Sequence, residues 1–206
     1  MTRIIAGFAG SLSLEVPRFG TRPTSDRVRE AIFSSLEAKD AIAGARVVDL
    51  YAGSGALGLE AASRGARVVT LVEKSHGATQ SCRKNAALVV KAAPKDAKPA
   101  IEVTGQPVQA FLTSSLAEWD LAFIDPPYDL GPAELVHNLE QLAPRLSDGA
   151  IVVVERSSRD PEPAWPGGLE LERRKDYGDT TLWWLVSTGS TTEAGSTTEA
   201  GSTAGG

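Results

Sequence analysis

The stretch Val47-Val48-Asp49-Leu50-Tyr51-Ala52-Gly53-Ser54-Gly55-Ala56-Leu57-Gly58 decides the fold. It begins as an apolar run, passes through two glycines and continues in a sequence that suits a helix. Gly53 and Gly55 lack a Cβ, so the backbone can turn tightly there and a ligand can approach it closely. The first N–H groups of the following helix, with the positive end of its dipole, would face that ligand. The stretch therefore predicts a strand–turn–helix unit that builds a nucleotide-sized site.

Strand-like and helix-like patterns alternate on both sides of this stretch. Short apolar runs predict strands at residues 46–50, 68–72, 100–104, 120–124 and 150–154. Between them, helical patterns cover residues 56–63, 75–90 (with Ser75 as its cap), 108–113 and 132–142, and a closing hairpin covers 169–177 and 181–186. Such alternation predicts an α/β fold with a doubly wound, mostly parallel sheet and helices on both faces. Ligands of such sheets lie at the carboxyl ends of the strands.

The two ends of the chain differ from this central part. Residues 1–40 predict an N-terminal extension with a small hairpin (3–7 and 12–17) and a helix capped by Thr24 or Ser25. Residues 41–188 form the predicted catalytic domain. Residues 189–206 repeat Gly-Ser-Thr-Thr-Glu-Ala with no core-forming residue larger than alanine, so a disordered low-complexity tail is expected there.

Composition limits the classes of protein that fit. A chain of 206 residues with 42% hydrophobic residues suits one domain, and a net charge of −5 argues against a wholly basic nucleic-acid binder. Residues 1–29 nevertheless carry a net charge of +3, which a solvated arm with a chance excess of arginine would also show. The single cysteine, Cys82, and two histidines without ligand-like spacing predict no disulfide and no metal site. No apolar segment suits a signal peptide or a membrane span, so a cytoplasmic protein is expected.

The glycine turn alone does not identify its ligand. Gly53 to Gly58 match G-x-G-x-x-G, and Glu73 at the end of the second strand could accept hydrogen bonds from ribose hydroxyls. Both features fit NAD and S-adenosylmethionine alike. Asp49 favours the second ligand, because a carboxylate there would repel a pyrophosphate and could pair with a cationic amino group. A loop-bracing or helix-capping carboxylate is the alternative for Asp49.

A second motif, Asp125-Pro126-Pro127-Tyr128, follows the fourth strand directly. Two prolines fix φ and make this loop rigid. The Asp125 side chain and the Pro126 carbonyl could each accept one N–H of a planar amine, while the Tyr128 ring stacks on the base that carries it. The motif therefore predicts an orienting clamp for an amine, although Asp-Pro-Pro is also common turn chemistry.

Together these motifs resemble class I S-adenosylmethionine-dependent methyltransferases that act on exocyclic amines. Three further pieces resemble the RsmD family of bacterial 16S rRNA guanine-N2 methyltransferases: Arg3-Ile4-Ile5-Ala6-Gly7, the helix entry that starts at Arg22-Pro23-Thr24, and the closing Tyr177-Gly178-Asp179-Thr180-Thr181. The resemblance covers roughly residues 3–187. It implies a seven-stranded Rossmann-like sheet, S-adenosyl-L-methionine as cofactor, and 16S rRNA or the small ribosomal subunit as partner.

The resemblance also implies roles for individual residues. The catalytic set is Asp125, Pro126, Pro127 and Tyr128. The cofactor-binding set is Asp49, Tyr51, Gly53, Ser54, Gly55, Glu73, Lys74, Gln106, Val108 and Asp125. Relatives place a polar group near the adenine amine, and Pro107 occupies that position here, so either Gln106 substitutes for it or the adenine relies on backbone contacts. The RNA-binding set is Arg3, Arg22, Thr24 and Arg27.

Other interpretations of the sequence remain open. A DNA exocyclic-amine methyltransferase shares the Asp125 to Tyr128 motif, but the chain carries no inserted region for reading DNA sequence. An NAD(P) oxidoreductase would leave that motif without a role, and a non-catalytic ribosome-binding factor would not need Asp49, Glu73 and Asp125. The sequence is nearly silent on oligomeric state, and a monomer is the working expectation.

Overall fold

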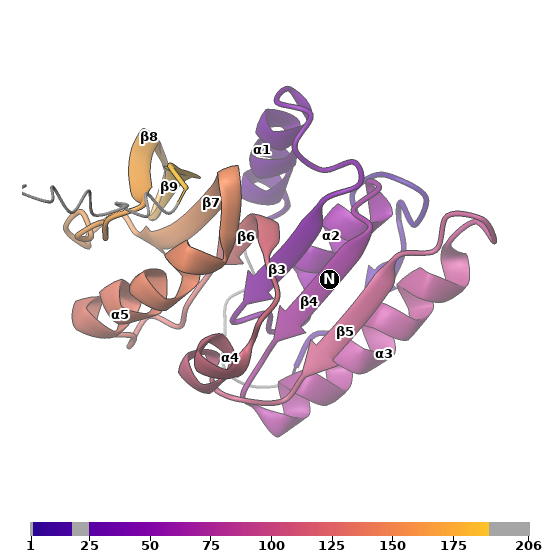
Figure 1. The fold of residues 1–206 in the computed structure, drawn as a ribbon. Coiled ribbons are helices and arrows are strands. Elements are labelled where there is room, and N and C mark those ends of the chain that lie inside the picture. The colour runs from indigo at the N-terminus through magenta and orange to yellow at the C-terminus, as the bar shows by residue number, and fades with distance from the viewer. Residues whose placement is uncertain (1, 18–24, 190–206) are drawn as a thin grey trace, which may run out of the picture.

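A seven-stranded sheet forms the centre of the protein, whose computed structural model describes residues 2–17 and 25–189 (Figure 1). The strand order is β5-β4-β3-β6-β7-β9-β8, with β3 to β7 parallel and β9 antiparallel to both β7 and β8. The mostly parallel, doubly wound sheet predicted from the sequence is confirmed. The strands are β3 (Arg46–Leu50), β4 (Val68–Val72), β5 (Ala100–Thr104), β6 (Trp119–Ile124), β7 (Leu146–Ser157), β8 (Leu169–Tyr177) and β9 (Thr180–Ser187).

Helices cover both faces of this sheet because the strands are apolar on both sides. Successive side chains of a strand point to opposite faces. Val47 accordingly packs in one buried cluster with residues of the first three helices, and Val48 packs in a second cluster with residues of the last two. The helices are α1 (Asp26–Glu37), α2 (Ala56–Ser63), α3 (His76–Ala92), α4 (Val108–Ser114) and α5 (Pro132–Leu142), followed by a 3-10 turn η1 (Ala143–Arg145).

The parallel strands end in register at one edge of the sheet. Leu50 at the end of β3 pairs with Val72 of β4 and with Ile124 of β6, and Ile124 pairs with Val154 of β7. The chain direction of the crossovers reverses between β3 and β6, which is where ligands of doubly wound sheets bind. The residues that follow these ends therefore lie side by side: Tyr51, Glu73, Asp125 and Glu155.

One strand is much longer than the sequence predicts. β7 covers Leu146–Ser157, whereas the apolar run predicts only residues 150–154. Leu146 pairs with Trp119 beyond an irregularity in the β6–β7 register, and at the other end Ser157 pairs with Thr180 of β9. Polar residues at both ends of β7 hide this extension, since strand pairing rather than hydrophobicity defines it.

The starts of two helices were predicted from serine caps, with different outcomes. Ser25 caps α1, because the Val28 N–H donates to Ser25 Oγ at 3.3 Å. Thr24, the other candidate, lies outside the described residues. Ser75 occupies the N-cap position of α3 as predicted, but its side chain makes no capping hydrogen bond. Its backbone N–H instead donates to Glu73 Oε1 at 2.7 Å.

The N-terminal extension forms less of a hairpin than predicted. Only β1 (Thr2–Arg3) and β2 (Ser13–Leu14) pair, in place of residues 3–7 with 12–17. The backbone N–H groups of Ile5 and Ala6 donate to the Glu60 carboxylate of α2, at 2.6 and 2.9 Å. These two groups satisfy their hydrogen bonds on the catalytic domain, so the hairpin is not continued at Ile5 and Ala6, and the chain packs on α2 there.

A buried ion network fixes α1 and the extension to α2. Arg29 is fully buried, and its Nη2 donates to the Asp26 carboxylate and to the Arg3 carbonyl, both at 2.8 Å. Its Nη1 lies 3.9 Å from Glu60, which also accepts from Arg64 Nε at 2.8 Å. The net charge of +3 counted over residues 1–29 therefore overstates the surface charge, since it includes the buried Arg29.

Two further predictions concern the ends and the membrane. A disordered tail was predicted for residues 189–206. All of these residues except Gly189 lie outside the described part of the chain, so the disorder stays a prediction. Within that described part, no helix is long and apolar enough to cross a bilayer.

Glu60→Ala should lower the free energy of unfolding by about 3–5 kcal/mol, because it removes the carboxylate partner of two buried arginines. Urea denaturation followed by circular dichroism measures this loss. Glu37→Ala is the matched control: it removes the half-exposed partner of Arg64, and should cost at most about 1 kcal/mol. Equal, small losses for both variants would contradict a structural role for the buried network.

Candidate active site

The glycines of the turn after β3 have different structural roles. Gly53 and Gly55 adopt φ of +56° and +81°, which L side chains rarely adopt. A Cβ on Gly53 would meet nothing within 4 Å, so this glycine leaves open space beside the strand ends. A Cβ on Gly58 would lie 2.3 Å from Leu71 Cδ2, so that glycine lets α2 pack closely on β4. Gly53 thus stays accessible to a ligand, and the close packing of α2 on β4 holds the turn against the sheet.

Tyr51 begins this turn in a strained conformation. Its φ is +67°, an uncommon value for a bulky residue and one that recurs at functional sites. The buried Asn138 of α5 donates from Nδ2 to the Tyr51 hydroxyl at 2.7 Å. Burial raises the pKa of Tyr51 to about 12, so the hydroxyl stays protonated at neutral pH.

Asp49 is buried beneath the glycine turn. Its Oδ2 accepts a hydrogen bond from the Gly58 N–H at 2.8 Å, which is the bracing role considered from the sequence. Burial raises the pKa of Asp49 to about 7, and the negative charges of Asp125 and Glu73 raise it further. The hydrogen bond from Gly58 lowers the pKa but does not offset the burial. Asp49 also lines the pocket described below, so it can brace the turn and still face a ligand.

Glu73 links the end of β4 to the same turn. Its Oε2 accepts from the Gly53 N–H at 3.0 Å, and its Oε1 accepts from the Ser75 N–H. A carboxylate has about four acceptor sites, so these two bonds leave capacity for the hydroxyls of a ligand.

Two adjoining hollows lie above the strand ends, and both are lined by residues of the predicted site. The first is lined by Asp49, Tyr51, Gly53, Ser54, Asp125, Pro126, Pro127 and Tyr128 among the predicted residues. The second is lined by Tyr51, Gly53, Glu73, Lys74, Val108 and Asp125. Gly55 and Gln106 line neither.

The loop after β6 presents unused hydrogen-bonding groups to the first hollow. Pro126 is buried, and its carbonyl accepts no hydrogen bond from residues 2–17 or 25–189. The Pro127 carbonyl, by contrast, accepts from the Leu130 N–H at 2.9 Å, which closes the loop. The Tyr128 side chain is 73% exposed and offers an aromatic face to solvent.

Several lining residues were missed by the sequence reasoning. Val16 and Pro17 form a wall from the extension, held there because Asn85 of α3 bonds to the backbone of both Glu15 and Ser54. Across the hollow lie Glu155, Arg156, Ser157 and Thr180. The sequence did contain a signal for Glu155, because it follows an apolar run just as Asp125 does. Thr180 belongs to the closing motif, Tyr177 to Thr181, which supported the family resemblance but was given no role in the site.

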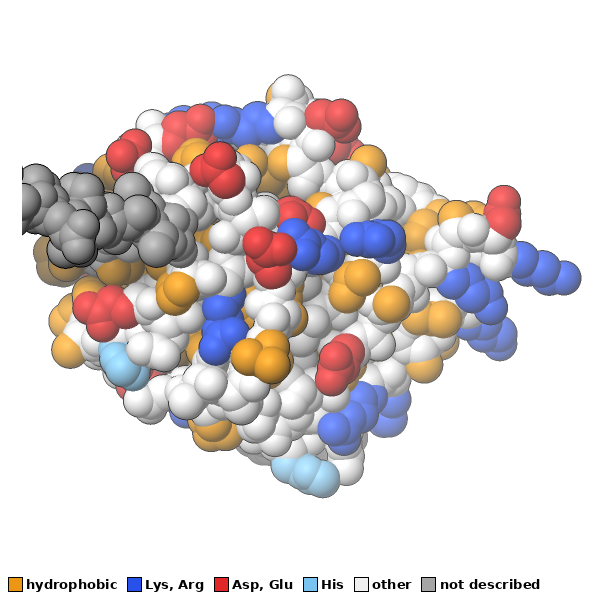
Figure 2. Space-filling model, viewed as in Figure 1, with side chains coloured by type: hydrophobic (Ala, Val, Ile, Leu, Met, Phe, Trp, Pro, Cys, Tyr) orange, Lys and Arg blue, Asp and Glu red, His pale blue; other side chains and the backbone are white. Residues whose placement is uncertain are grey.

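The predicted RNA-binding arginines are only partly described. Arg3 and Arg27 are exposed, and Arg3 Nε lies 3.9 Å from Asp26. Arg22 and Thr24 lie outside the described residues, so their placement stays a prediction. Figure 2 shows acidic and basic side chains intermixed on the face it displays, in keeping with a net charge of −5.

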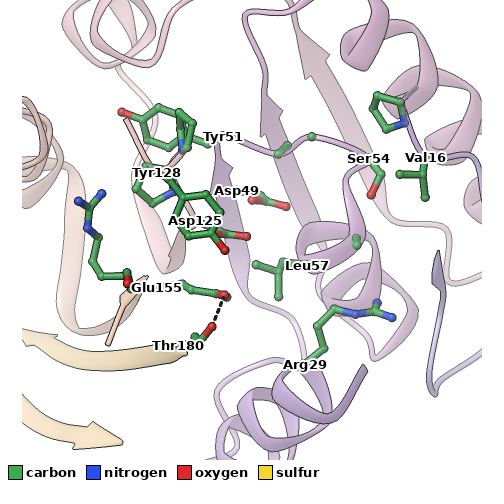
Figure 3. A pocket seen from close by; sticks show the side chains of 18 residues that line it. Val16, Arg29, Asp49, Tyr51, Ser54, Leu57, Asp125, Tyr128, Glu155 and Thr180 are labelled. Atoms are coloured by element: carbon green, nitrogen blue, oxygen red, sulfur yellow. Dashed lines mark hydrogen bonds between the residues drawn. The ribbon is translucent and has the colours of Figure 1, made fainter. Parts of the chain in front are cut away.

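The chemistry of the site suits a cationic ligand. In Figure 3 the carboxylates of Asp49 and Asp125 lie in the same part of the pocket, and the raised pKa of Asp49 records the charges of Asp125 and Glu73. A pyrophosphate there would meet three acids, whereas an ammonium or sulfonium group would neutralise them. Across the described ranges, no cluster of histidine, cysteine and acidic residues could hold a metal ion. This sheet, with its glycine turn and Asp-Pro-Pro-Tyr loop, defines a class I methyltransferase.

Comparisons with known proteins identify the family. The family model described as conserved hypothetical protein 95 matches residues 2–186. Ribosomal RNA small subunit methyltransferase D of Escherichia coli strain K12 is 36% identical over 177 residues, 85% of each chain, and its namesake from Haemophilus influenzae is 34% identical over 179 residues, 85% of this chain and 89% of that one. The solved structure described as "Putative methyltransferase yhhF from Escherichia coli" has a TM-score of 0.76 at 34% identity, with 91% of this chain and 98% of that one covered. The chain belongs to the RsmD family of methyltransferases.

Asp49→Asn should stabilise the protein at alkaline pH. The folded protein holds the pKa of Asp49 near 7, above its usual 3.8, so the wild type loses stability as pH rises through this window. The stability difference between variant and wild type should therefore grow by about 1–3 kcal/mol from pH 5 to pH 8, as measured by urea denaturation. The exposed Asp148→Asn variant is the control and should show no such trend. A difference that does not change with pH would contradict the burial effect.

Proposed function

We propose that the protein transfers a methyl group from S-adenosylmethionine to the exocyclic N2 amine of a guanine in 16S rRNA of the small ribosomal subunit. The observation that carries the proposal is the placement of the Asp125 to Tyr128 loop across one continuous hollow from the Gly53 turn. The names of the family relatives, which are ribosomal RNA small subunit methyltransferases, support the same activity.

The residues fit this cofactor in two parts. Asp49, Gly53 and Ser54 of the first hollow would hold the methionine end, whose amino group would neutralise Asp49. In the second hollow, the spare acceptor capacity of Glu73 would bind the ribose, and Val108 would pack against the base. When bound, S-adenosylmethionine supplies an electrophilic methyl group on a positively charged sulfur.

The loop after β6 orients the acceptor amine. The Asp125 carboxylate and the Pro126 carbonyl each accept one amine N–H, which turns the nitrogen lone pair towards the methyl group. Asp125 also stabilises the positive charge that develops on that nitrogen during transfer. The exposed ring of Tyr128 stacks on the guanine plane, as aromatic residues do with unpaired bases.

Asp125→Ala should keep the affinity for S-adenosylhomocysteine within a few fold while methyl transfer falls by about 100-fold or more, because the clamp acts on the amine. Calorimetry measures the binding, and transfer of a radiolabelled methyl group to 16S rRNA measures the activity. Asp129→Ala, an exposed aspartate in the same loop, is the control and should keep both properties. Activity that survives in Asp125→Ala would rule out the clamp.

Mass spectrometry of nucleosides tests the function itself. Small-subunit rRNA from cells that lack the protein should gain N2-methylguanosine when protein and cofactor are added back. Free 16S rRNA, assembled subunits and duplex DNA are offered in parallel, so that the preferred substrate is identified by the same readout. Methylation of DNA alone, or binding of NADH in place of S-adenosylhomocysteine, would overturn the proposal.

The double variant Arg22→Glu/Arg27→Glu should weaken RNA binding and flatten its dependence on salt, by about 0.7 in the log–log slope for each phosphate that the protein no longer neutralises. Affinity for S-adenosylhomocysteine should not change. Lys95→Glu/Lys98→Glu, the same charge change on two exposed lysines of the α3–β5 loop, is the control. An unchanged slope in the arginine variant would remove these arginines from the RNA-binding surface.

A further inference from the structure

A second acid stands next to the catalytic loop. Glu155 follows Val154 on β7 as Asp125 follows Ile124 on β6, and Val154 and Ile124 are partners in the parallel register. Neighbouring strands lie about 4.8 Å apart, so the two acids lie side by side, with Asp125 just beyond the end of β6 and Glu155 within β7. Both line the first hollow, and Figure 3 shows the Glu155 side chain directed into it, towards Asp125.

β9 holds this acid in place from the other side. The Thr180 hydroxyl contacts Glu155 Oε1 at 3.5 Å, and Thr180 is itself fixed by pairing with Ser157. Glu155 is half-buried, and its neighbours on β7 and β9 are strand residues with little freedom to move. A carboxylate placed on rigid strands beside a substrate can read hydrogen-bond donors with high selectivity.

The Watson–Crick edges of the bases differ at the atom next to their amine. In guanine, N1 beside the N2 amine carries a hydrogen, so the edge presents adjacent donors. In adenine and cytosine, the ring nitrogen beside the amine carries a lone pair and accepts. An ionised carboxylate only accepts hydrogen bonds, so it attracts the guanine N1–H and repels the other two bases.

We propose that Glu155 selects guanine, by accepting the N1–H while the Asp125 to Tyr128 loop holds the N2 amine. This inference rests on the proposed function and adds its specificity determinant. Asp125, the Pro126 carbonyl and Glu155 then form a row of acceptors that matches guanine alone. The same row argues against the adenine and cytosine amines on which DNA methyltransferases with a similar loop act.

The expected size of the preference for guanine follows from the free-energy cost of leaving buried polar groups without a hydrogen-bond partner. Sites built to hydrogen-bond a substrate group reject analogues that lack it by factors of up to about 10⁴–10⁵. Because Glu155 is only half-buried, we expect a smaller preference, of about 100-fold in kcat/KM.

The experiment compares guanine with 2-aminopurine at the methylated position of 16S rRNA, once mass spectrometry has located it. 2-Aminopurine keeps the C2 amine, but its N1 is an acceptor without a hydrogen. The wild type should prefer guanine by about 100-fold in kcat/KM. The amide of Glu155→Gln can donate an N–H to N1 of 2-aminopurine, while its oxygen can still accept the guanine N1–H, so the preference should fall to about 10-fold or less.

Two controls separate this role from a structural one. Glu170→Gln, an exposed glutamate on β8 outside both hollows, should keep the wild-type preference. Calorimetry with S-adenosylhomocysteine should give the same affinity for Glu155→Gln and wild type. The inference is overturned if the wild type uses both bases equally, or if Glu155→Gln slows both bases by the same factor. A wild type that methylates no guanine in 16S rRNA overturns the proposed function first, and the inference with it.

Discussion

The site depends on one constraint, the common register of four parallel strand ends. Pairing of Leu50 with Val72 and Ile124, and of Ile124 with Val154, brings the next residue of each strand to the same edge. Three of those next residues are acids, and Asp49 lies just below them. Burial raises the pKa of Asp49 to about 7, and the negative charges of Asp125 and Glu73 raise it further. Backbone N–H groups of Gly53, Gly58 and Ser75 offset part of this cost. The sheet thus concentrates negative charge where a cationic ligand would neutralise it.

The N-terminal extension belongs to this site as well as to the proposed RNA surface. Its backbone N–H groups bind Glu60, and the buried Arg29 ties α1 to the same carboxylate. Further along, Asn85 joins the extension to the Ser54 carbonyl of the glycine turn, which brings Val16 and Pro17 to the wall of the hollow. The extension and the glycine turn therefore share one set of hydrogen bonds.

Under the proposed function the Asp125 to Tyr128 loop orients an amine, but the loop alone does not choose the base. Under the proposed function, Asp125 and the Pro126 carbonyl meet only the two hydrogens that the amines of guanine, adenine and cytosine share. Discrimination needs a group that faces the adjacent ring nitrogen, and Glu155 occupies that place on the neighbouring strand. Fixing this residue on β7 instead of on a loop costs little, because the β9 pairing that supports it is needed to complete the sheet.

The sequence by itself determined the alternation of strands and helices, the glycine turn, and the two motifs at residues 49–58 and 125–128, because these are local patterns of hydrophobicity and backbone geometry. It misjudged the length of β7, whose polar ends become strand only through pairing, and the length of the N-terminal hairpin, because the Ile5 and Ala6 N–H groups bind Glu60 of α2. The charge count from the sequence included Arg29 as a surface charge. Tertiary packing instead buries this side chain against Asp26 and Glu60. Only the tertiary structure placed Glu155 beside Asp125, since strand register joins residues 30 positions apart that no local pattern connects.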